Sequence, residues 1–321
     1  MREVKPPITP LEVTTLLENY FEQPVKRVAP LGTGHIARVF SFQTGGQAYV
    51  IRFVTEATAN TFKVELALSA LLKKQDGTGM AVPLPPILHH GMFGEYHFAV
   101  APMAAGQPLD ELPPEAAEQI LPKAIEALDA IHEVDVSGTQ GYGWLDVTAN
   151  NQLPGGLFPS WPAFLLSVIN ETEGDFYGFW HGLFETSFLE RPLFDQLYNE
   201  MESLFPYLPK ERYLVHGDYG FNNVLAQDGE ITAVIDWNAK YGDFLFDIAR
   251  LNFIAPDVGY PDRFLRYYAA QNRHVPNFAE RLRCYQCYTA LDGMRFFAKM
   301  DQPDGYAWVK RRIREASLDT E

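Results

Sequence analysis

The chain of 321 residues is 47% hydrophobic and 14% aromatic, which supports a well-filled interior, excludes long disorder and predicts two packing units. Its formal net charge of −15 argues against a nucleic-acid partner, and it suits either a cationic ligand or solubility alone. The apolar runs are far shorter than a membrane span and the start shows no apolar signal region, so we expect a cytoplasmic protein without a membrane partner.

The first predicted elements are a short helix and a β-hairpin. Residues 9–12 combine a capping threonine, a proline and a glutamate, as at the start of a helix. Residues 38–43 alternate as a strand, Gly45 and Gly46 make a turn, and residues 47–54 form the return strand. We therefore expect an antiparallel sheet near the N-terminus.

A glycine-containing turn precedes this hairpin, at Gly32, Thr33 and Gly34. Backbone N–H groups of such a turn can approach phosphates, because glycine adds no side chain. The turn lacks the full G-x-G-x-x-G pattern, so an ordinary hairpin turn is the alternative. We treat the three residues as candidate nucleotide contacts.

A helix is predicted for residues 58–74, and it carries Glu65. Its apolar residues recur at helical spacing and predict one buried face. That face comprises Phe62, Leu66, Ala70 and Leu71.

Residues 95–108 read as an apolar strand that ends in a connection with proline and glycine, and residues 140–209 read as an insertion with helices at 161–170 and 188–205. Between those helices, carboxylates alternate with aromatic residues. They are Glu171, Glu173, Asp175, Phe176, Tyr177, Phe179, Trp180 and Glu185. Carboxylates could pair with ammonium groups while aromatic faces cover sugar rings. The alternative is a helix connection whose aromatic residues belong to the core.

The segment 214–250 carries the chemistry. Asp218 follows His216 and Gly217, Asn223 comes five residues later, and Asp236 comes thirteen residues after that. Phosphoryl transfer to a hydroxyl needs a carboxylate that orients the attacking oxygen and takes its proton. It also needs oxygen ligands for Mg²⁺, which prefers amide and carboxylate oxygens. Asp218 suits the first role, and Asn223 and Asp236 suit the second.

Strands are expected on both sides of this motif. Residues 212–215 lead in, Gly229 and Glu230 make a turn, and residues 231–235 form a β-branched run. Such a hairpin would bring the chain back beside Asp236. The alternative to a phosphoryl-transfer site is a turn in which these Asp and Asn residues are structural caps.

The pattern H-G-D-x-x-x-x-N, then I-D-W, then G-D-x-x-x-D resembles the aminoglycoside phosphotransferase family, and most of all its hygromycin B phosphotransferases. The resemblance implies a protein-kinase-like α+β fold, with an antiparallel N-terminal sheet and a mainly helical C-terminal lobe. The N-terminal nucleotide-binding lobe would comprise residues 1–104, and the catalytic and substrate-binding lobe residues 105–321. Asp218 would be the catalytic base, and Asn223 and Asp236 the Mg²⁺ ligands.

The resemblance also implies nucleotide contacts. Arg52 stands where protein kinases carry a lysine that grips the phosphates, and Glu65 would be its partner. Arginine departs from the kinase pattern and offers a planar fork instead. Ala101 and Met103 would lie in the hinge that holds the base of ATP or GTP, and their sequence does not decide between the two nucleotides.

Candidate acceptor contacts are Asn222, Trp237 and Asp175, although Trp237 could equally pack under the metal loop. His216 is expected to brace the loop by hydrogen bonding. Asp243 and Asp247, at the start of the next helix, are expected to cap that helix or to brace the loop. Cys284 and Cys287 fall within an apolar helix, which favours buried core thiols over a redox or metal motif.

These patterns predict an enzyme that moves the γ-phosphate of ATP or GTP, with Mg²⁺, to a hydroxyl of a small, cationic molecule. The resemblance implies an aminoglycoside of the hygromycin type as the acceptor, and the expected state is a monomer or weak dimer. A metabolite kinase of the same fold, acting on choline or methylthioribose, would share every motif. A non-catalytic nucleotide-binding protein is a second alternative. A protein kinase is disfavoured, because Asp236-Trp237-Asn238 replaces D-F-G and no A-P-E follows.

Overall fold

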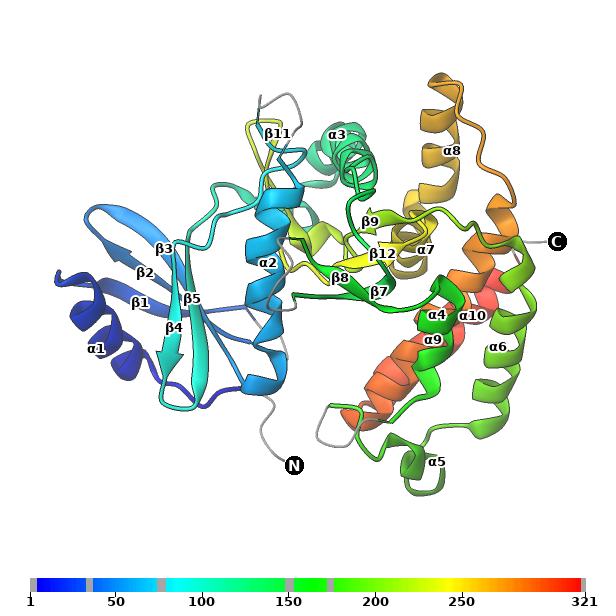
Figure 1. The fold of residues 1–321 in the computed structure, drawn as a ribbon, viewed down its shortest axis with the longest axis horizontal. Helices are drawn as coiled ribbons and strands as arrows, with labels where there is room; N and C mark the ends of the chain where they lie inside the picture. The colour runs from blue at the N-terminus through cyan, green and yellow to red at the C-terminus, as the bar shows by residue number, and fades with distance from the viewer. Residues whose placement is uncertain (1–4, 33–36, 74–78, 148–152, 172–175, 319–321) are drawn as a thin grey trace. The chain divides into compact units, whose positions relative to one another are not determined.

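The structure is a computed structural model that describes residues 5–32, 37–73, 79–147, 153–171 and 176–318 (Figure 1). Its contacts divide the chain into two units. Unit 1 comprises Met1–Ala127, Asp146–Pro154 and Phe221–Asp236, and unit 2 comprises Leu128–Leu145, Gly155–Gly220 and Trp237–Glu321. In the described part of the chain, no helix is both long and apolar enough for a membrane crossing.

Unit 1 is built on a five-stranded antiparallel sheet of order β1-β2-β3-β5-β4. Its strands are β1 (Lys26–Leu31), β2 (Arg38–Thr44), β3 (Gln47–Val54), β4 (His89–Phe93) and β5 (Tyr96–Pro102). Helix α1 (Pro10–Phe21) begins with the predicted capping box at Thr9 and packs its apolar residues on this sheet. The shared core consists of Ile8, Val13, Leu17, Val25, Phe40, Phe42, Ile51, Phe53, Phe98 and Val100.

The predicted hairpin is confirmed. Strands β2 and β3 pair in continuous register from Arg38 opposite Phe53 to Thr44 opposite Gln47. Gly45 and Gly46 both have positive φ, as the tight turn requires. The register places Arg52 in the middle of the sheet, opposite Ala99 of the neighbouring strand.

Helix α2 (Asn60–Leu71) follows the hairpin and lies beside the sheet in Figure 1. The predicted helix is present, but its predicted buried face is wrong in part: Leu66 is 38% exposed and Ala70 is also exposed. Four of the buried positions, Phe62, Glu65, Leu68 and Leu71, recur every third residue, and Val64 is buried as well. The face is set by Glu65, which turns inward to meet Arg52 of β3.

Unit 1 also holds a small sheet of order β11-β10-β6, made of β11 (Glu230–Val234), β10 (Val224–Gln227) and β6 (Gln107–Pro108). The chain enters β6 at Gly106, which has a φ of +89°. A side chain at this position would overlap the carbonyl oxygen of Ala226. This pairing joins residues after position 104 to unit 1. The contact-based division therefore differs from the predicted lobes, which remain a prediction.

Unit 2 contains a four-stranded sheet of order β8-β7-β12-β9. Its strands are β7 (Tyr142–Asp146), β8 (Gly155–Phe158), β9 (Tyr213–Val215) and β12 (Lys240–Gly242). Strand β12 pairs antiparallel with both β7 and β9. Because β9 leads directly into the segment with Asp218, this sheet fixes the start of the candidate catalytic loop.

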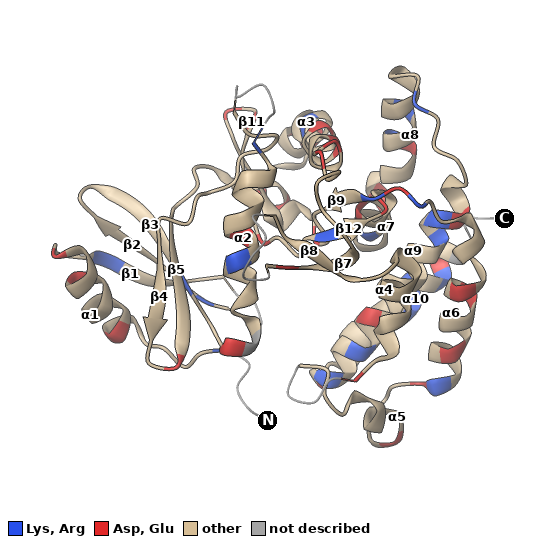
Figure 2. Ribbon diagram, viewed as in Figure 1, with Lys and Arg blue, Asp and Glu red and all other residues tan. Residues whose placement is uncertain are grey.

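The rest of unit 2 is mainly helical. Its helices are α4 (Trp161–Leu166), α5 (Leu183–Thr186), α6 (Arg191–Ser203), α7 (Leu245–Ile254), α8 (Tyr260–Ala270), α9 (Phe278–Lys299) and α10 (Pro303–Leu318), and α3 (Pro114–His132) is shared with unit 1. Helix α9 packs against α6, α7 and α10. Figure 2 shows acidic and basic residues side by side along α6, α9 and α10. Cys284 and Cys287 are buried in α9, as predicted.

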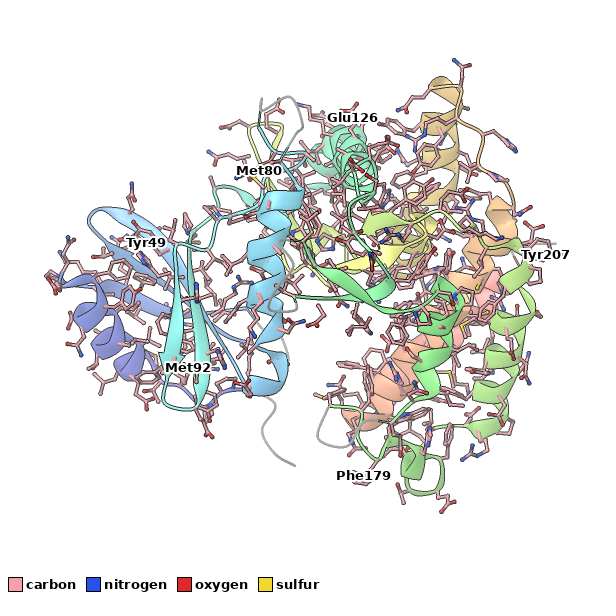
Figure 3. The ribbon with its side chains drawn as sticks, in the orientation of Figure 1. Tyr49, Met80, Met92, Glu126, Phe179 and Tyr207 are labelled. Carbon is pink, nitrogen blue, oxygen red and sulfur yellow. The ribbon has the colours of Figure 1, made fainter. Side chains whose placement is uncertain are left out.

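The aromatic residues of the insertion are divided between core and surface. Trp180 is fully buried, and Tyr177 lies under the guanidinium of Arg295 at 3.7 Å from its ring centroid. Phe179, labelled in Figure 3 on the loop before α5, is 73% exposed and has a positive φ of 59°. Packing therefore accounts for Trp180 and Tyr177, while Phe179 remains open to a ligand. Asp175 lies outside the described residues.

Candidate active site

The loop that carries Asp218 is held by a buried carboxylate. Asp247 of α7 accepts hydrogen bonds from the backbone N–H groups of His216, at 2.9 Å, and Gly217, at 2.8 Å. Its Oδ2 also lies 3.1 Å from Nε2 of buried His132. Burial alone would raise the pKa of Asp247, but the His132 hydrogen bond and charge and the loop contacts hold this pKa below its usual value. The predicted bracing role of Asp247 is thus confirmed.

Two further contacts fix the loop backbone. The Asn238 amide donates to the His216 carbonyl at 3.0 Å, and the Asp218 amide donates to His216 Nδ1 at 3.2 Å. Gly217 has a φ of +79°, and a side chain there would overlap the carbonyl of Asn238. Only glycine fits this turn without strain. Asp218 is therefore placed by a rigid loop.

Asp218 is paired with Arg250 of α7, a contact that the sequence analysis did not predict. Nε and Nη2 of Arg250 donate to the same oxygen, Oδ1 of Asp218, at 2.9 and 2.7 Å. The side chains are 26% and 38% exposed, respectively. A sequence signal existed, because Arg250 follows Asp247 by three residues and so shares its helix face.

The two candidate metal ligands lie together in unit 1. Asn223 immediately precedes β10, and Asp236 follows the last paired residue of β11 by two positions. The amide of Ile235 donates to the Asn223 carbonyl at 2.9 Å, which closes the open end of the hairpin between them. The predicted return of the chain beside Asp236 is confirmed. An amide oxygen and a carboxylate form an oxygen donor set that suits Mg²⁺.

Asp236 adopts a left-handed backbone conformation with φ of 55°. Such a conformation is uncommon for a residue other than glycine, although aspartate and asparagine tolerate it best. The conformation ends the strand and leaves the Asp236 residue exposed, whereas Asn223 is only 2% exposed. A positioned, exposed carboxylate at the end of a buried strand fits a ligand role.

Arg52 and Glu65 form the predicted pair. Nη1 and Nη2 of Arg52 donate to the two oxygens of Glu65 at 2.7 and 2.5 Å, with side chains 19% and 7% exposed. Burial would lower the pKa of Arg52, but the charge and hydrogen bonds of Glu65, together with the charge of Asp236, raise it instead. Unit 1 therefore holds a fixed guanidinium within electrostatic reach of a candidate metal ligand.

The remaining nucleotide candidates are only partly described. Gly32 ends β1 with a φ of +67°, whereas Thr33 and Gly34 lie outside the described residues. Ala101 of β5 is buried, opposite Val50. The Met103 amide donates to the Ala48 carbonyl at 3.0 Å, so a nucleotide contact from Met103 would have to use its carbonyl or side chain. The nucleotide roles of these residues stay predictions.

The acceptor candidates Asn222 and Trp237 differ in exposure. Asn222 is exposed and donates through Nδ2 to Oδ1 of Asn223 at 2.9 Å. Trp237 is 6% exposed and packs on His216, with ring centroids 4.5 Å apart. The alternative packing role of Trp237 is thus present in the structure, and contact with an acceptor stays a prediction for both residues.

Lys240 of β12 is a second buried charge that the sequence analysis missed. Its Nζ donates to the Asn238 carbonyl at 2.7 Å and lies 3.8 Å from the ring centroid of Trp144, its cross-strand partner. Burial first, and then the charge of Arg250, lower its pKa to about 7. Lys240 thus supports the same carbonyl that Gly217 approaches.

Comparison with known proteins places this site in a family. Residues 27–281 match the phosphotransferase enzyme family, which is more than half of the chain. The chain belongs to the phosphotransferase enzyme family. Asp218, Asn223 and Asp236 all fall within the matched region of this phosphotransferase.

Individual relatives agree with this membership. Hygromycin-B 4-O-kinase of Escherichia coli is 29% identical over 315 residues, which cover 96% of this phosphotransferase and 85% of the relative. The crystal structure of aminoglycoside phosphotransferase APH(4)-Ia has a TM-score of 0.79 at 27% identity and covers 96% of this chain and 98% of that chain.

A thermostable mutant of the same protein, in a ternary complex with AMP-PNP and hygromycin B, has a TM-score of 0.78 at 26% identity, covering 95% of this chain and 97% of its own. The predicted kinase-like α+β fold is confirmed.

Proposed function

We propose that this phosphotransferase moves the γ-phosphate of ATP to a hydroxyl of an aminoglycoside of the hygromycin type. The similarity to a hygromycin-B 4-O-kinase over nearly the whole chain supports this acceptor class. The relatives solved with AMP-PNP or ADP support ATP, rather than GTP, as the donor. The net charge of −15 suits a cationic acceptor.

The observation that carries the proposal is the fixed carboxylate of Asp218 on a loop clamped by Asp247. In the reaction, the acceptor oxygen forms a bond to the γ-phosphorus and its proton passes to Asp218. The bond from the γ-phosphorus to the bridging oxygen breaks, and ADP leaves. Because the transition state of such transfers is loose, positioning contributes more than base strength.

The residues of unit 1 supply the charges that the phosphates require. Arg52, held by Glu65, presents a permanent cation to the phosphates. A Mg²⁺ ion held by Asn223 and Asp236 would neutralise the charge on the phosphate oxygens. The exposure of Asp236, which keeps its carboxylate reachable, supports this assignment.

The test is a coupled assay of ADP release with hygromycin B, other aminoglycosides and several metabolite alcohols. We expect turnover with hygromycin B, and an Asp218→Asn variant should lose about 10²–10⁴-fold in kcat while binding ATP normally. Asp228→Asn is the matched control, because Asp228 is exposed on the turn between β10 and β11. Turnover with a metabolite alcohol alone would refute the aminoglycoside assignment, and full activity of Asp218→Asn would refute the base.

A further inference from the structure

Helix α7 contacts the candidate catalytic loop through two side chains. Asp247 and Arg250 lie three residues apart, so their side chains project from the same face of the helix. Asp247 binds the backbone of the loop at His216 and Gly217, and Arg250 binds the side chain of Asp218. One rigid helix thus fixes both the path of the loop and the direction of its carboxylate.

The geometry of the Arg250 contact is asymmetric. Nε and Nη2 of Arg250 both donate to Oδ1 of Asp218. Within the described part of the chain, the side-chain hydrogen bonds of Arg250 go to this oxygen. Burial would lower the pKa of Arg250, but the charge and hydrogen bonds of Asp218 outweigh burial and raise it. The guanidinium therefore remains charged, and both of its hydrogen bonds to Asp218 fix the same oxygen.

We propose that Arg250 is a positioning residue for phosphoryl transfer, which holds Oδ1 of Asp218 and so fixes the direction in which this carboxylate meets the proton of the acceptor hydroxyl. The inference rests on the proposed function. In a loose transition state the attacking oxygen has lost little of its proton, so the direction of the accepting carboxylate matters more than its basicity. Pairing with arginine restricts the orientation of the carboxylate.

If the pair served only the fold, removal of Arg250 would lower stability, whereas a positioning role predicts a lower kcat. Half-exposed ion pairs contribute little to folding stability, so a variant without Arg250 should fold normally. The chain offers a matched control in Arg273, which is 30% exposed and donates to both oxygens of Asp129 at 2.8 and 2.9 Å. Asp129 has no place in the proposed reaction.

The experiment compares Arg250→Ala, Arg250→Lys and Arg273→Ala by thermal unfolding and steady-state kinetics. We expect Arg250→Ala to lose about 10²-fold in kcat with an unchanged KM for ATP. Non-denaturing guanidinium chloride should restore part of that kcat, and Arg250→Lys should lose less. Arg273→Ala should keep its kcat and show no response to guanidinium. Wild-type kcat in Arg250→Ala, or a loss that guanidinium cannot restore, would overturn the proposal.

A second measurement does not depend on turnover. In protein labelled with ¹³C at the aspartate carboxyl carbons, the resonance of Asp218 can be assigned by its absence from Asp218→Asn. This resonance should shift in Arg250→Ala and stay in place in Arg273→Ala. If the wild-type protein phosphorylated no acceptor, the proposed function would fail while the resonance still tested the contact. An unshifted Asp218 resonance in Arg250→Ala would refute the positioning role by itself.

Discussion

The substitution Lys240→Met tests the cost of burying an ionisable amine beside the loop that carries Asp218. Burial, above all, lowers the pKa of Lys240 to about 7 from its ordinary value of 10.5. The unfolded chain therefore binds one more proton than the folded protein between about pH 7 and 10.5, so stability rises with pH in this window. At 1.36 kcal/mol for each unit, the wild-type penalty below pH 7 approaches about 5 kcal/mol.

Methionine removes the titrating group and keeps an apolar side chain of similar length against Trp144. The lost hydrogen bond to Asn238 offsets about 1 kcal/mol of the gain. We expect Lys240→Met to be more stable than wild type at pH 7.5. We also expect the difference in stability between the two proteins to shrink by about 2 kcal/mol from pH 7.5 to 9. In this pH range only the wild-type protein takes up a proton at position 240 when it unfolds.

Urea denaturation followed by tryptophan fluorescence measures this difference in stability, and it reports on unit 2. All 5 tryptophans, at positions 144, 161, 180, 237 and 308, belong to unit 2, as does Lys240. Lys63→Met, on the exposed face of α2, is the control and should change stability equally at both pH values. A difference between Lys240→Met and wild type that does not vary with pH would show that the Lys240 pKa is not lowered.

Three other outcomes are expected. Glu65→Gln leaves the guanidinium of Arg52 without its buried partner; it should destabilise the protein by about 3 kcal/mol and raise the KM for ATP. Asp236→Asn should require a higher Mg²⁺ concentration for half-maximal activity, and an unchanged Mg²⁺ dependence would exclude Asp236 as a ligand. Burial raises the pKa of Cys287 to about 12, so the native protein should resist thiol reagents that react at once after denaturation; rapid modification of native protein would contradict this burial.

Local chemistry explains which parts of the fold could be predicted from sequence. The hairpin of β2 and β3 was predicted nearly to the residue, because Gly45 and Gly46 specify the turn and alternation specifies the strands. The buried face of α2 was wrong in part at Leu66, because an apolar pattern cannot foresee that a glutamate turns inward. Propensity and periodicity are local, whereas the choice of buried face depended on Arg52 from another element.

The candidate site shows the same limit. Spacing alone singled out Asp218, Asn223 and Asp236 as candidates, since the chemistry requires these residue types within one short segment. It did not identify Arg250, which reaches the loop through a tertiary contact of α7, or Lys240, which lies beside Gly217 because β12 pairs with β9. The spacing of Asp247 and Arg250 indicates a shared helix face, but it does not show what either side chain contacts, and the usual interpretation of such a charge is a solvated residue.

The left-handed backbone of Asp236 places function and stability in opposition. A residue other than glycine costs about 1 kcal/mol in this conformation, and glycine at position 236 would relieve that cost. The same replacement would remove the proposed ligand carboxylate. A single substitution could therefore yield a protein that folds better and transfers nothing, so that only selection for activity, and not selection for folding, would retain aspartate at this position.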